Sequence, residues 1–172
     1  MRGRPAAGEH AAYYSQYIDR VAGDDVLSVL AEQARGVPAF LRAIGETASL
    51  HRYAEGKWSV REVVGHVNDA ERVFQGRAWW FARAQKGPLS SFDPDSCARS
   101  ARAHETPWAA LVDEFEAVRA STLAFFRALD EEAWTRTGTA SDNPFSVRAL
   151  AYICAGHVDH HLAVLREKYD PR

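Results

Sequence analysis

The sequence predicts an all-α protein whose fold is a four-helix bundle. Apolar residues recur at intervals of three and four along four separate segments, which is typical of helices that bury one face. Substantial polar connections separate these segments. No segment shows the alternation of apolar and polar residues that marks a half-buried strand. Four amphipathic helices can all bury their apolar faces when they pack as a bundle.

The size and composition of the chain fit one folded domain. It has 172 residues, of which 47% are hydrophobic, 26% charged and 11% aromatic. A chain of this length can bury roughly 70% of its unfolded surface, so neither disulfides nor a metal ion are needed for folding. We expect an N-terminal arm over residues 1–23 and one bundle domain over residues 24–172.

The charge and the apolar segments exclude several classes of protein. The formal net charge is −2, which disfavours nucleic-acid binding because such proteins carry a basic surface. No segment has the apolar length of a membrane span, and the N-terminal residues lack the apolar stretch of a secretory signal. Cys97 and Cys154 do not form the pattern of a disulfide framework. We therefore expect a cytoplasmic protein that binds neither membranes nor nucleic acid.

The first helix is expected to follow the acidic pair at residues 24–25, because negative charge stabilises a helix N-terminus. Its apolar residues continue at helical spacing from Val26 to Ile44. Gly36 and Pro38 lie within this run and predict a kink. The preceding arm carries three tyrosines and is expected to pack on the surface of the domain.

The second helix has the clearest start in the sequence. Ser59 and Glu62 have the spacing of a capping box, in which each side chain bonds to the other residue's backbone amide. The helix is expected to continue to about Gln85. The polar connection 86–105 can span roughly 60 Å when extended, whereas this helix is about 40 Å long. The chain can therefore return to the same end and start a third helix parallel to the second.

The last two helices also have recognisable starts. Thr106 followed by Pro107 suits an N-cap and a first helical position, and the apolar stripe continues to Leu129. A second connection, residues 130–145, leads to a fourth helix that is expected to begin at Ser146 and to end near residue 168.

Three of the seven histidines fall on inward stripes of these helices. His157 and His161 are four residues apart, so both rings project from one face, a spacing that suits two ligands of one metal ion. His66 lies about 10 Å from the start of the second helix, and His161 lies about 10 Å from the end of the fourth. The three rings therefore meet if these two helices are antiparallel. The connection 86–105 permits that arrangement, which is an up-down-down-up bundle.

Other interpretations of these histidines stay open. Buried histidines are often hydrogen-bonded core residues without a metal. His160 lies beside the inward stripe and could replace His161 as a ligand. Cys154 is one turn before His157 and could supply a thiolate, although a small buried side chain is the more common role of such a cysteine.

Several charged residues lie on the second and fourth helices near the histidines. The favoured interpretation places Asp69, Glu71 and Asp159 on the solvent-exposed surface. Arg77 and Arg148 could hold charged groups of a substrate, and a structural role with the charged end reaching solvent is the alternative.

Two segments resemble motifs of the DinB-like family, which includes the YfiT-like proteins. The segment 56–66, GKWSVREVVGH, resembles the start of that family's second helix, and the segment 156–162, GHVDHHL, resembles its final helix. The segment 69–72, DAER, and the Phe-Asp pair at 92–93 also fit the family. The resemblance extends from about residue 24 to residue 169.

This resemblance implies an up-down-down-up bundle that binds a divalent metal ion through three histidines. The family's ligand positions match His66, His157 and His161, and the metal is typically zinc or nickel. The resemblance also suggests a homodimer. Trp79 and Trp80 point in different directions on one helix, so one of them is a candidate for the subunit interface.

Three neutral ligands leave the charge of the ion undiminished and leave coordination positions open. Such an ion can lower the pKa of bound water to about 7 or bind a low-molecular-weight thiol as its thiolate. Some DinB-like relatives are thiol-dependent transferases or isomerases, and others have been considered metal-dependent hydrolases. We therefore expect thiol activation for S-transfer to a small electrophile, with hydrolysis or a non-catalytic binding bundle as alternatives. The sequence identifies no further catalytic residue.

Overall fold

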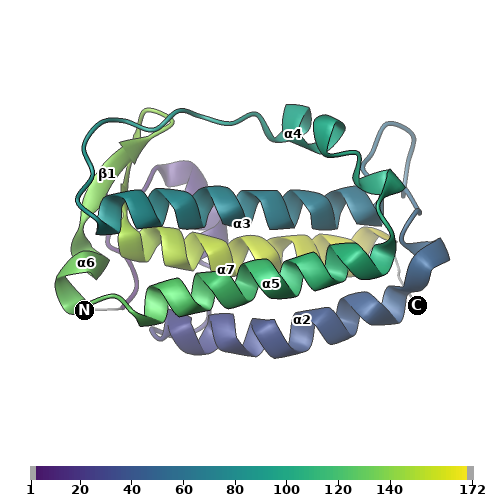
Figure 1. Cartoon of the computed structure of the whole chain (residues 1–172), viewed down its shortest axis with the longest axis horizontal. Helices are drawn as coiled ribbons and strands as arrows, with labels where there is room; N and C mark the ends of the chain where they lie inside the picture. Colours follow the sequence, from purple (N-terminus) through teal and green to yellow (C-terminus); the bar gives the residue numbers. More distant parts are fainter. Residues whose placement is uncertain (1–2, 170–172) are drawn as a thin grey trace.

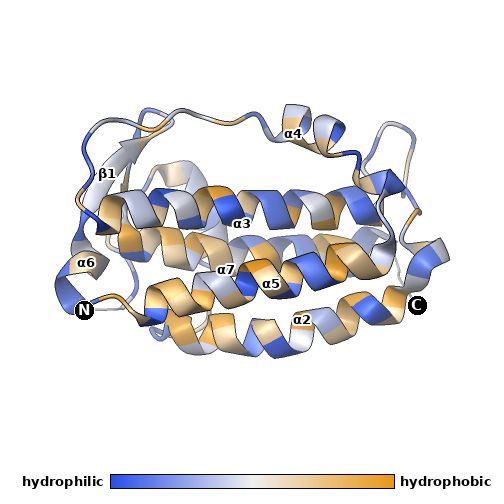
Figure 2. Ribbon diagram, in the orientation of Figure 1, coloured by the Kyte–Doolittle hydropathy of each residue, from blue (hydrophilic) through white to orange (hydrophobic). Residues whose placement is uncertain are grey.

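The computed structural model describes residues 3–169 (Figure 1). Four long helices lie side by side, which confirms the predicted helical bundle: α2 (Val26–Ala48), α3 (Val60–Ala82), α5 (Trp108–Arg127) and α7 (Val147–Val164). Apolar residues recur along each long helix with polar residues between them (Figure 2). The shorter helical elements are η1 (Ala12–Tyr14), α1 (Ser15–Ile18), α4 (Pro94–Ala101), η2 (Ala103–Glu105), α6 (Glu131–Thr135) and η3, a π-helical turn (Leu165–Tyr169).

Contacts between the helices define their relative directions. The Asn68 side chain of α3 donates to the Leu111 carbonyl of α5 at 3.1 Å, and Gln75 donates to Ser121 further along both helices at 3.0 Å. Residue numbers therefore rise together, and α3 and α5 are parallel. His66, near the start of α3, lies against a histidine near the end of α7, so α3 and α7 are antiparallel. No helix within residues 3–169 combines the length and apolarity that a membrane span requires.

The local helix signals are largely confirmed. The Ser59 hydroxyl accepts from the Glu62 amide at 3.3 Å, and the Glu62 carboxylate accepts from the Ser59 amide at 2.7 Å, as a capping box requires. Ser146 caps α7 by accepting from the Ala149 amide at 3.1 Å. The break in α2 lies at Gly45 (φ 77°, ψ 168°) rather than at the predicted kink near residues 36–38.

The connection between α3 and α5 contains helix α4, which the sequence analysis did not identify. The start of α4 has a local signal, because the Asp93 carboxylate accepts from the amides of Asp95 and Ser96, and Pro94 follows the cap. Figure 1 shows the connection passing along the outside of α3 before α5 begins. It therefore returns the chain to the end of the bundle where α3 started.

A short hairpin occupies the second connection, so the expectation of no strands was wrong. Strands β1 (Thr137–Ala140) and β2 (Asn143–Ser146) pair antiparallel around Ser141 and Asp142, whose φ angles are 50° and 58°. Two positive φ angles are typical of a type I′ turn. Strands of four residues are too short for alternation to be recognised. Gly138 is required here because a Cβ at this position would lie 2.1 Å from the Phe81 ring.

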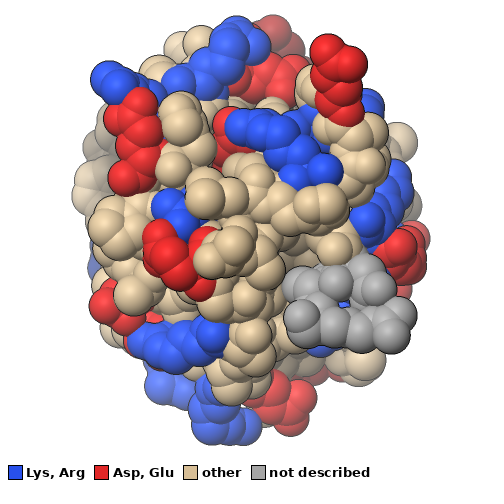
Figure 3. All heavy atoms as spheres, turned by 90° about the vertical axis from the view of Figure 1, so that its right-hand side faces the viewer, with Lys and Arg blue, Asp and Glu red and all other residues tan. Residues whose placement is uncertain are grey.

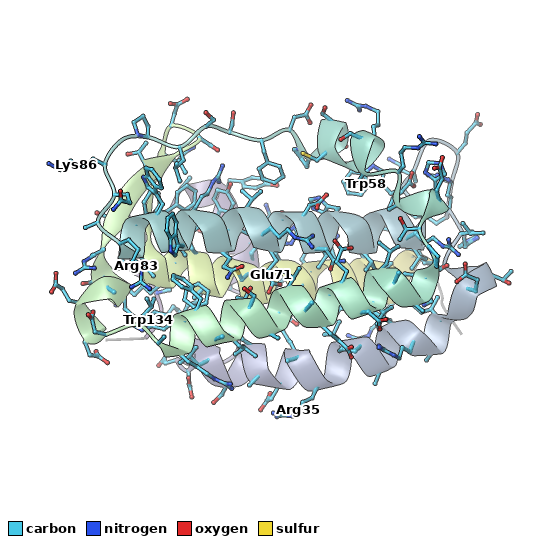
Figure 4. All side chains as sticks on the ribbon, in the orientation of Figure 1. Arg35, Trp58, Glu71, Arg83, Lys86 and Trp134 are labelled. Carbon is cyan, nitrogen blue, oxygen red and sulfur yellow. The ribbon has the colours of Figure 1, made fainter. Side chains whose placement is uncertain are left out.

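One connected set of buried hydrogen bonds touches all four long helices. Arg119 of α5 donates to the Glu71 carboxylate of α3 at 2.8 and 2.7 Å, and to the Gln33 side chain of α2 at 2.5 Å. Gln33 in turn donates to the Ala155 carbonyl and the Asp159 carboxylate of α7 at 2.9 and 2.8 Å. Glu71 lies between the ribbons of α3 and α5 (Figure 4). The placement of Glu71 and Asp159 on the exposed surface was therefore wrong.

The N-terminal arm is held against α7 at two places. The Glu9 carboxylate accepts from Ser146 and from Arg148, each at 2.6 Å, near the start of α7. Further along, Gly156 permits a close approach, because a Cβ there would lie 1.9 Å from the Tyr17 carbonyl oxygen. These contacts place α1 directly against the middle of α7, close to His157.

Replacing Arg119 by Met is expected to reduce the free energy of unfolding by about 3–5 kcal/mol, because Glu71 would remain buried without a cation. Arg42→Met is the matched control, since Arg42 is exposed and pairs with Asp113 and Glu116 on the surface. It should cost less than about 1 kcal/mol. Chemical denaturation of both variants measures the difference, and equal losses would contradict a special role of the buried pair.

The arm is expected to loosen in acid. Hydrogen bonding to Arg148 lowers the pKa of Glu9 from 4.5 to about 2. A carboxyl with a lowered pKa in the folded state stabilises that state above its unfolded pKa, and this stability is lost as the pH falls toward 2. The ring signals of Tyr17 in NMR spectra should therefore shift between pH 4.5 and 2. In Glu9→Gln they should already be shifted at pH 7 and respond less to acid; an identical titration in both proteins would contradict the prediction.

Candidate metal centre

The structure brings together the three histidines that the sequence placed on inward stripes. His66 projects from α3, and His157 and His161 project from consecutive turns of α7. The Nε2 atom of His157 lies 3.1 Å from Nε2 of His66 and 3.1 Å from Nε2 of His161. The three potential ligand nitrogens all lie within 4.8 Å of one another. Three imidazoles from two helices thus point at one position.

The central nitrogen cannot satisfy both of its neighbours by hydrogen bonding. Nε2 of a neutral imidazole carries either one hydrogen or one lone pair, so His157 can form only one of the two 3.1 Å contacts as a hydrogen bond. A shared cation would accept the lone pairs of all three rings. Nitrogens bound to one tetrahedral ion at about 2.0–2.1 Å lie about 3.3 Å apart, which is close to the two separations of 3.1 Å that His157 makes.

Burial keeps these rings neutral. It lowers the pKa of His66 to about 4 and that of His161 to about 3, with a further contribution from neighbouring imidazoles. The same causes hold the pKa of His157, which is only 4% exposed, well below its usual value. At neutral pH the lone pairs are available, and the three histidines could hold a divalent metal ion.

The two other candidate ligands do not belong to this cluster. The His160 ring lies 5.0 Å from the His161 ring and 5.4 Å from the Tyr17 ring, measured between centroids. Its Nδ1 atom is buried and makes no hydrogen bond within the described chain. Cys154 is buried in the apolar core, where burial raises the pKa of its thiol well above the usual value. A neutral, buried thiol is a packing residue rather than a ligand.

A cavity of about 370 Å³ opens next to the three histidines. The N-terminal arm, α3, α7 and the connection before α4 all contribute to its wall, which is mainly aromatic. None of the described residues lining it carries a carboxylate. Besides His66, His157 and His161, the lining residues are Tyr13, Tyr14, Tyr17, Trp58, Ala70, Phe74, Phe92, Pro94 and His160.

A second cavity, of about 310 Å³, adjoins the first. Trp58, His160 and His161 line both cavities. The Trp58 ring is 5.0 Å from the His66 ring, and Figure 4 shows this residue near α4 at one end of the bundle. The second cavity is more polar and includes Lys57 and Asp95. Basic and acidic residues are interspersed over this end of the molecule (Figure 3).

The structure also places the other residues that the sequence singled out. Arg148 pairs with Glu9, away from the cavity, and Asp69 lines a separate groove between α3 and α4. Arg77 is buried. Trp79 is 47% exposed, and the homodimer for which it is a candidate contact stays a prediction.

Sequence reasoning missed the aromatic wall of the cavity. Trp58 was not considered as a site residue, and the three arm tyrosines were assigned only to the domain surface. The dense grouping of Tyr13, Tyr14 and Tyr17 was the one available signal. It could not show which helices the arm would contact.

The fold and the site together define a class of protein, a helical bundle in which three histidines cluster where α3 contacts α7. The family model of the DinB superfamily matches residues 29–165. The chain therefore belongs to the DinB superfamily. No curated protein sequence matches it.

Solved structures show the same fold at low sequence identity. YfiT from Bacillus subtilis, described as a probable metal-dependent hydrolase with an unusual four-helix bundle topology, has a TM-score of 0.69 and 18% identity. That comparison covers 95% of this chain and 89% of YfiT. A mycothiol-dependent maleylpyruvate isomerase has a TM-score of 0.66 and 13% identity over 80% of this chain. This chain spans only 58% of the isomerase's length.

Proposed function

We propose that this protein is a metal-dependent enzyme that activates a low-molecular-weight thiol for S-transfer to a small electrophile. His66, His157 and His161 are the proposed ligands of a divalent ion, zinc or nickel. The observation that carries the proposal is the convergence of three neutral imidazole nitrogens beside an aromatic cavity. A bound divalent ion would supply positive charge that favours the thiolate, which is the nucleophilic form of a thiol.

The two cavities offer space for two reactants. The aromatic cavity suits the apolar body of an electrophile, and the cavity with Lys57 and Asp95 suits a polar thiol. Trp58 and the proposed ligand His161 line both cavities. In the transfer, a sulfur–carbon bond forms as the bond from that carbon to the leaving group breaks, and the thiol proton passes to solvent. The thiol dependence of the related isomerase supports this choice of nucleophile.

Hydrolysis is the second candidate, because YfiT is described as a probable hydrolase. A hydrolase benefits from a base that removes a proton from the attacking water. The described wall of the aromatic cavity contains no carboxylate for this task. Within the aromatic cavity, where the electrophile is proposed to bind, this favours thiol transfer over hydrolysis.

We also propose an up-down-down-up order for the bundle, which the parallel arrangement of α3 and α5 supports. The proposed enzyme acts as a homodimer in the cytoplasm, where thiols are kept reduced.

Metal content tests the proposed ligands. Purified wild-type protein should contain close to one zinc or nickel ion per chain by mass spectrometry. The variants His66→Ala, His157→Ala and His161→Ala should each bind the ion at least about tenfold more weakly, because two imidazoles remain. His160→Ala is the matched control and should retain the metal. Folded wild-type protein that cannot be loaded would contradict the proposal, as would loss of metal in His160→Ala alone.

Activity tests the proposed chemistry separately. Loaded protein should accelerate the reaction of mycothiol, bacillithiol or glutathione with chlorodinitrobenzene, followed by absorbance. Metal removal or any ligand variant should reduce kcat/KM at least about a hundredfold, since thiolate formation depends on the ion. Hydrolysis of ester or amide substrates without thiol transfer, by the same loaded protein, would favour the second candidate.

A further inference from the structure

Three arginines of the described chain are buried, and one of them has no carboxylate partner. Arg119 pairs with Glu71, and Arg61 pairs with Glu46. Arg77 is 4% exposed, yet no carboxylate within residues 3–169 pairs with it. Burying a guanidinium without an anion is costly. For the other two buried arginines, a carboxylate offsets this cost.

The hydrogen bonds of Arg77 leave part of its guanidinium free. Nη2 donates to the Ser90 carbonyl at 3.0 Å and to the Ser141 hydroxyl at 2.8 Å. Nη1 is buried and has no hydrogen-bond partner in the described chain. These two acceptors are neutral, and so is the Tyr14 hydroxyl, a further side-chain hydrogen-bond partner of Arg77. All three orient the side chain without balancing its charge.

Arg77 lies behind the far wall of the aromatic cavity. His66, Ala70 and Phe74 line the cavity along one face of α3, and Arg77 continues that face about 16 Å from His66 along the helix axis. The Phe92 ring centroid is 5.9 Å from the guanidinium carbon. Phe92 and Tyr14 both line the cavity, and Tyr14 is the titratable neighbour of Arg77. Both of these rings of the cavity wall therefore lie next to the guanidinium.

Tyr14 supplies a second donor at the same place. Burial raises the pKa of its hydroxyl, and the Arg77 guanidinium opposes this rise without cancelling it. The hydroxyl therefore keeps its proton and can donate a hydrogen bond. Neither Tyr14 nor Phe92 belongs to a long helix: Tyr14 lies in the arm and Phe92 in the connection before α4. Phe92 is only half-buried, so its ring can turn aside without repacking the bundle, whereas the Tyr14 ring packs edge-on against Phe74 and Phe145.

We propose that Arg77 and Tyr14 form a carboxylate-binding subsite at the end of the cavity opposite the three histidines. In the enzyme proposed above, on which this role rests, the electrophile would then be an organic acid with an apolar body. Its carboxylate would lie at Arg77 and its reactive carbon near His66, His157 and His161. One free guanidinium nitrogen, Nη1, and one hydroxyl suit the two oxygens of a carboxylate better than the three of a phosphate.

Binding of benzoate tests this subsite without activity or metal. Benzamide has the same shape without the charge, so metal-free wild-type protein should bind benzoate at least about tenfold more tightly than benzamide in NMR titrations. Arg77→Met should abolish this preference, and Tyr14→Phe should weaken it several-fold. Arg20→Met removes the same charge from an exposed position near His160 and should leave the preference unchanged.

The outcomes separate this inference from the proposed function. Equal binding of benzoate and benzamide by the wild type would overturn the subsite, as would tighter binding of phenyl phosphate than of benzoate. Benzoate preference that survives in folded Arg77→Met would also overturn it. If Arg77→Met does not fold, an unchanged preference in Tyr14→Phe decides against the subsite. A failure to bind metal would overturn the proposed function but would not change the expected binding of benzoate.

Discussion

The carboxylate of Glu71 and the guanidinium of Arg119 meet in the interior of the bundle, where neither could remain charged without the other. Gln33 extends this pair to α2 and, through its contacts with α7, to the helix that carries two of the histidines. Such directional bonds fix how far each helix is displaced along its neighbours. A shift of α3 by one turn, about 5.4 Å, would both break the ion pair and remove His66 from the other two imidazoles.

The histidine cluster depends on this fixed arrangement because the lone pair of an imidazole nitrogen points in a single direction. Each nitrogen must lie about 2.0–2.1 Å from the same ion, with its lone pair directed at it, for one ion to bind all three. The residues around the rings exclude water. This burial lowers the pKa of His66 and His161 and so leaves their nitrogens unprotonated at neutral pH. Burial and helix register therefore act together, since a neutral ring that points elsewhere would not contribute to a metal centre.

The parts of the chain outside the long helices determine the shape of the cavity. The arm contributes tyrosines, and the connection before α4 contributes Phe92. Arg77 ties that connection to the β1–β2 turn through Ser90 and Ser141. The long helices thus carry the three imidazoles, whereas much of the aromatic wall comes from the arm and from the connection before α4. A single fold can host different functions, because function depends on the site that the fold carries.

The sequence by itself determined the features that depend on nearby residues. Ser59 with Glu62 and the Ser146 cap mark helix starts because capping bonds span three residues, and the four-residue spacing of His157 and His161 follows from the helix repeat. The length of the connection 86–105 also allowed the prediction that His66 lies beside these two histidines, and the structure places it there. Only the tertiary structure decided which distant groups become partners. Glu71 and Asp159 were placed on the surface, the cavity tyrosines were not recognised as site residues, and Arg77 could not be seen to lack a carboxylate. Burial and pairing depend on which side chains a neighbouring helix or segment presents, and no short-range pattern within one helix contains that information.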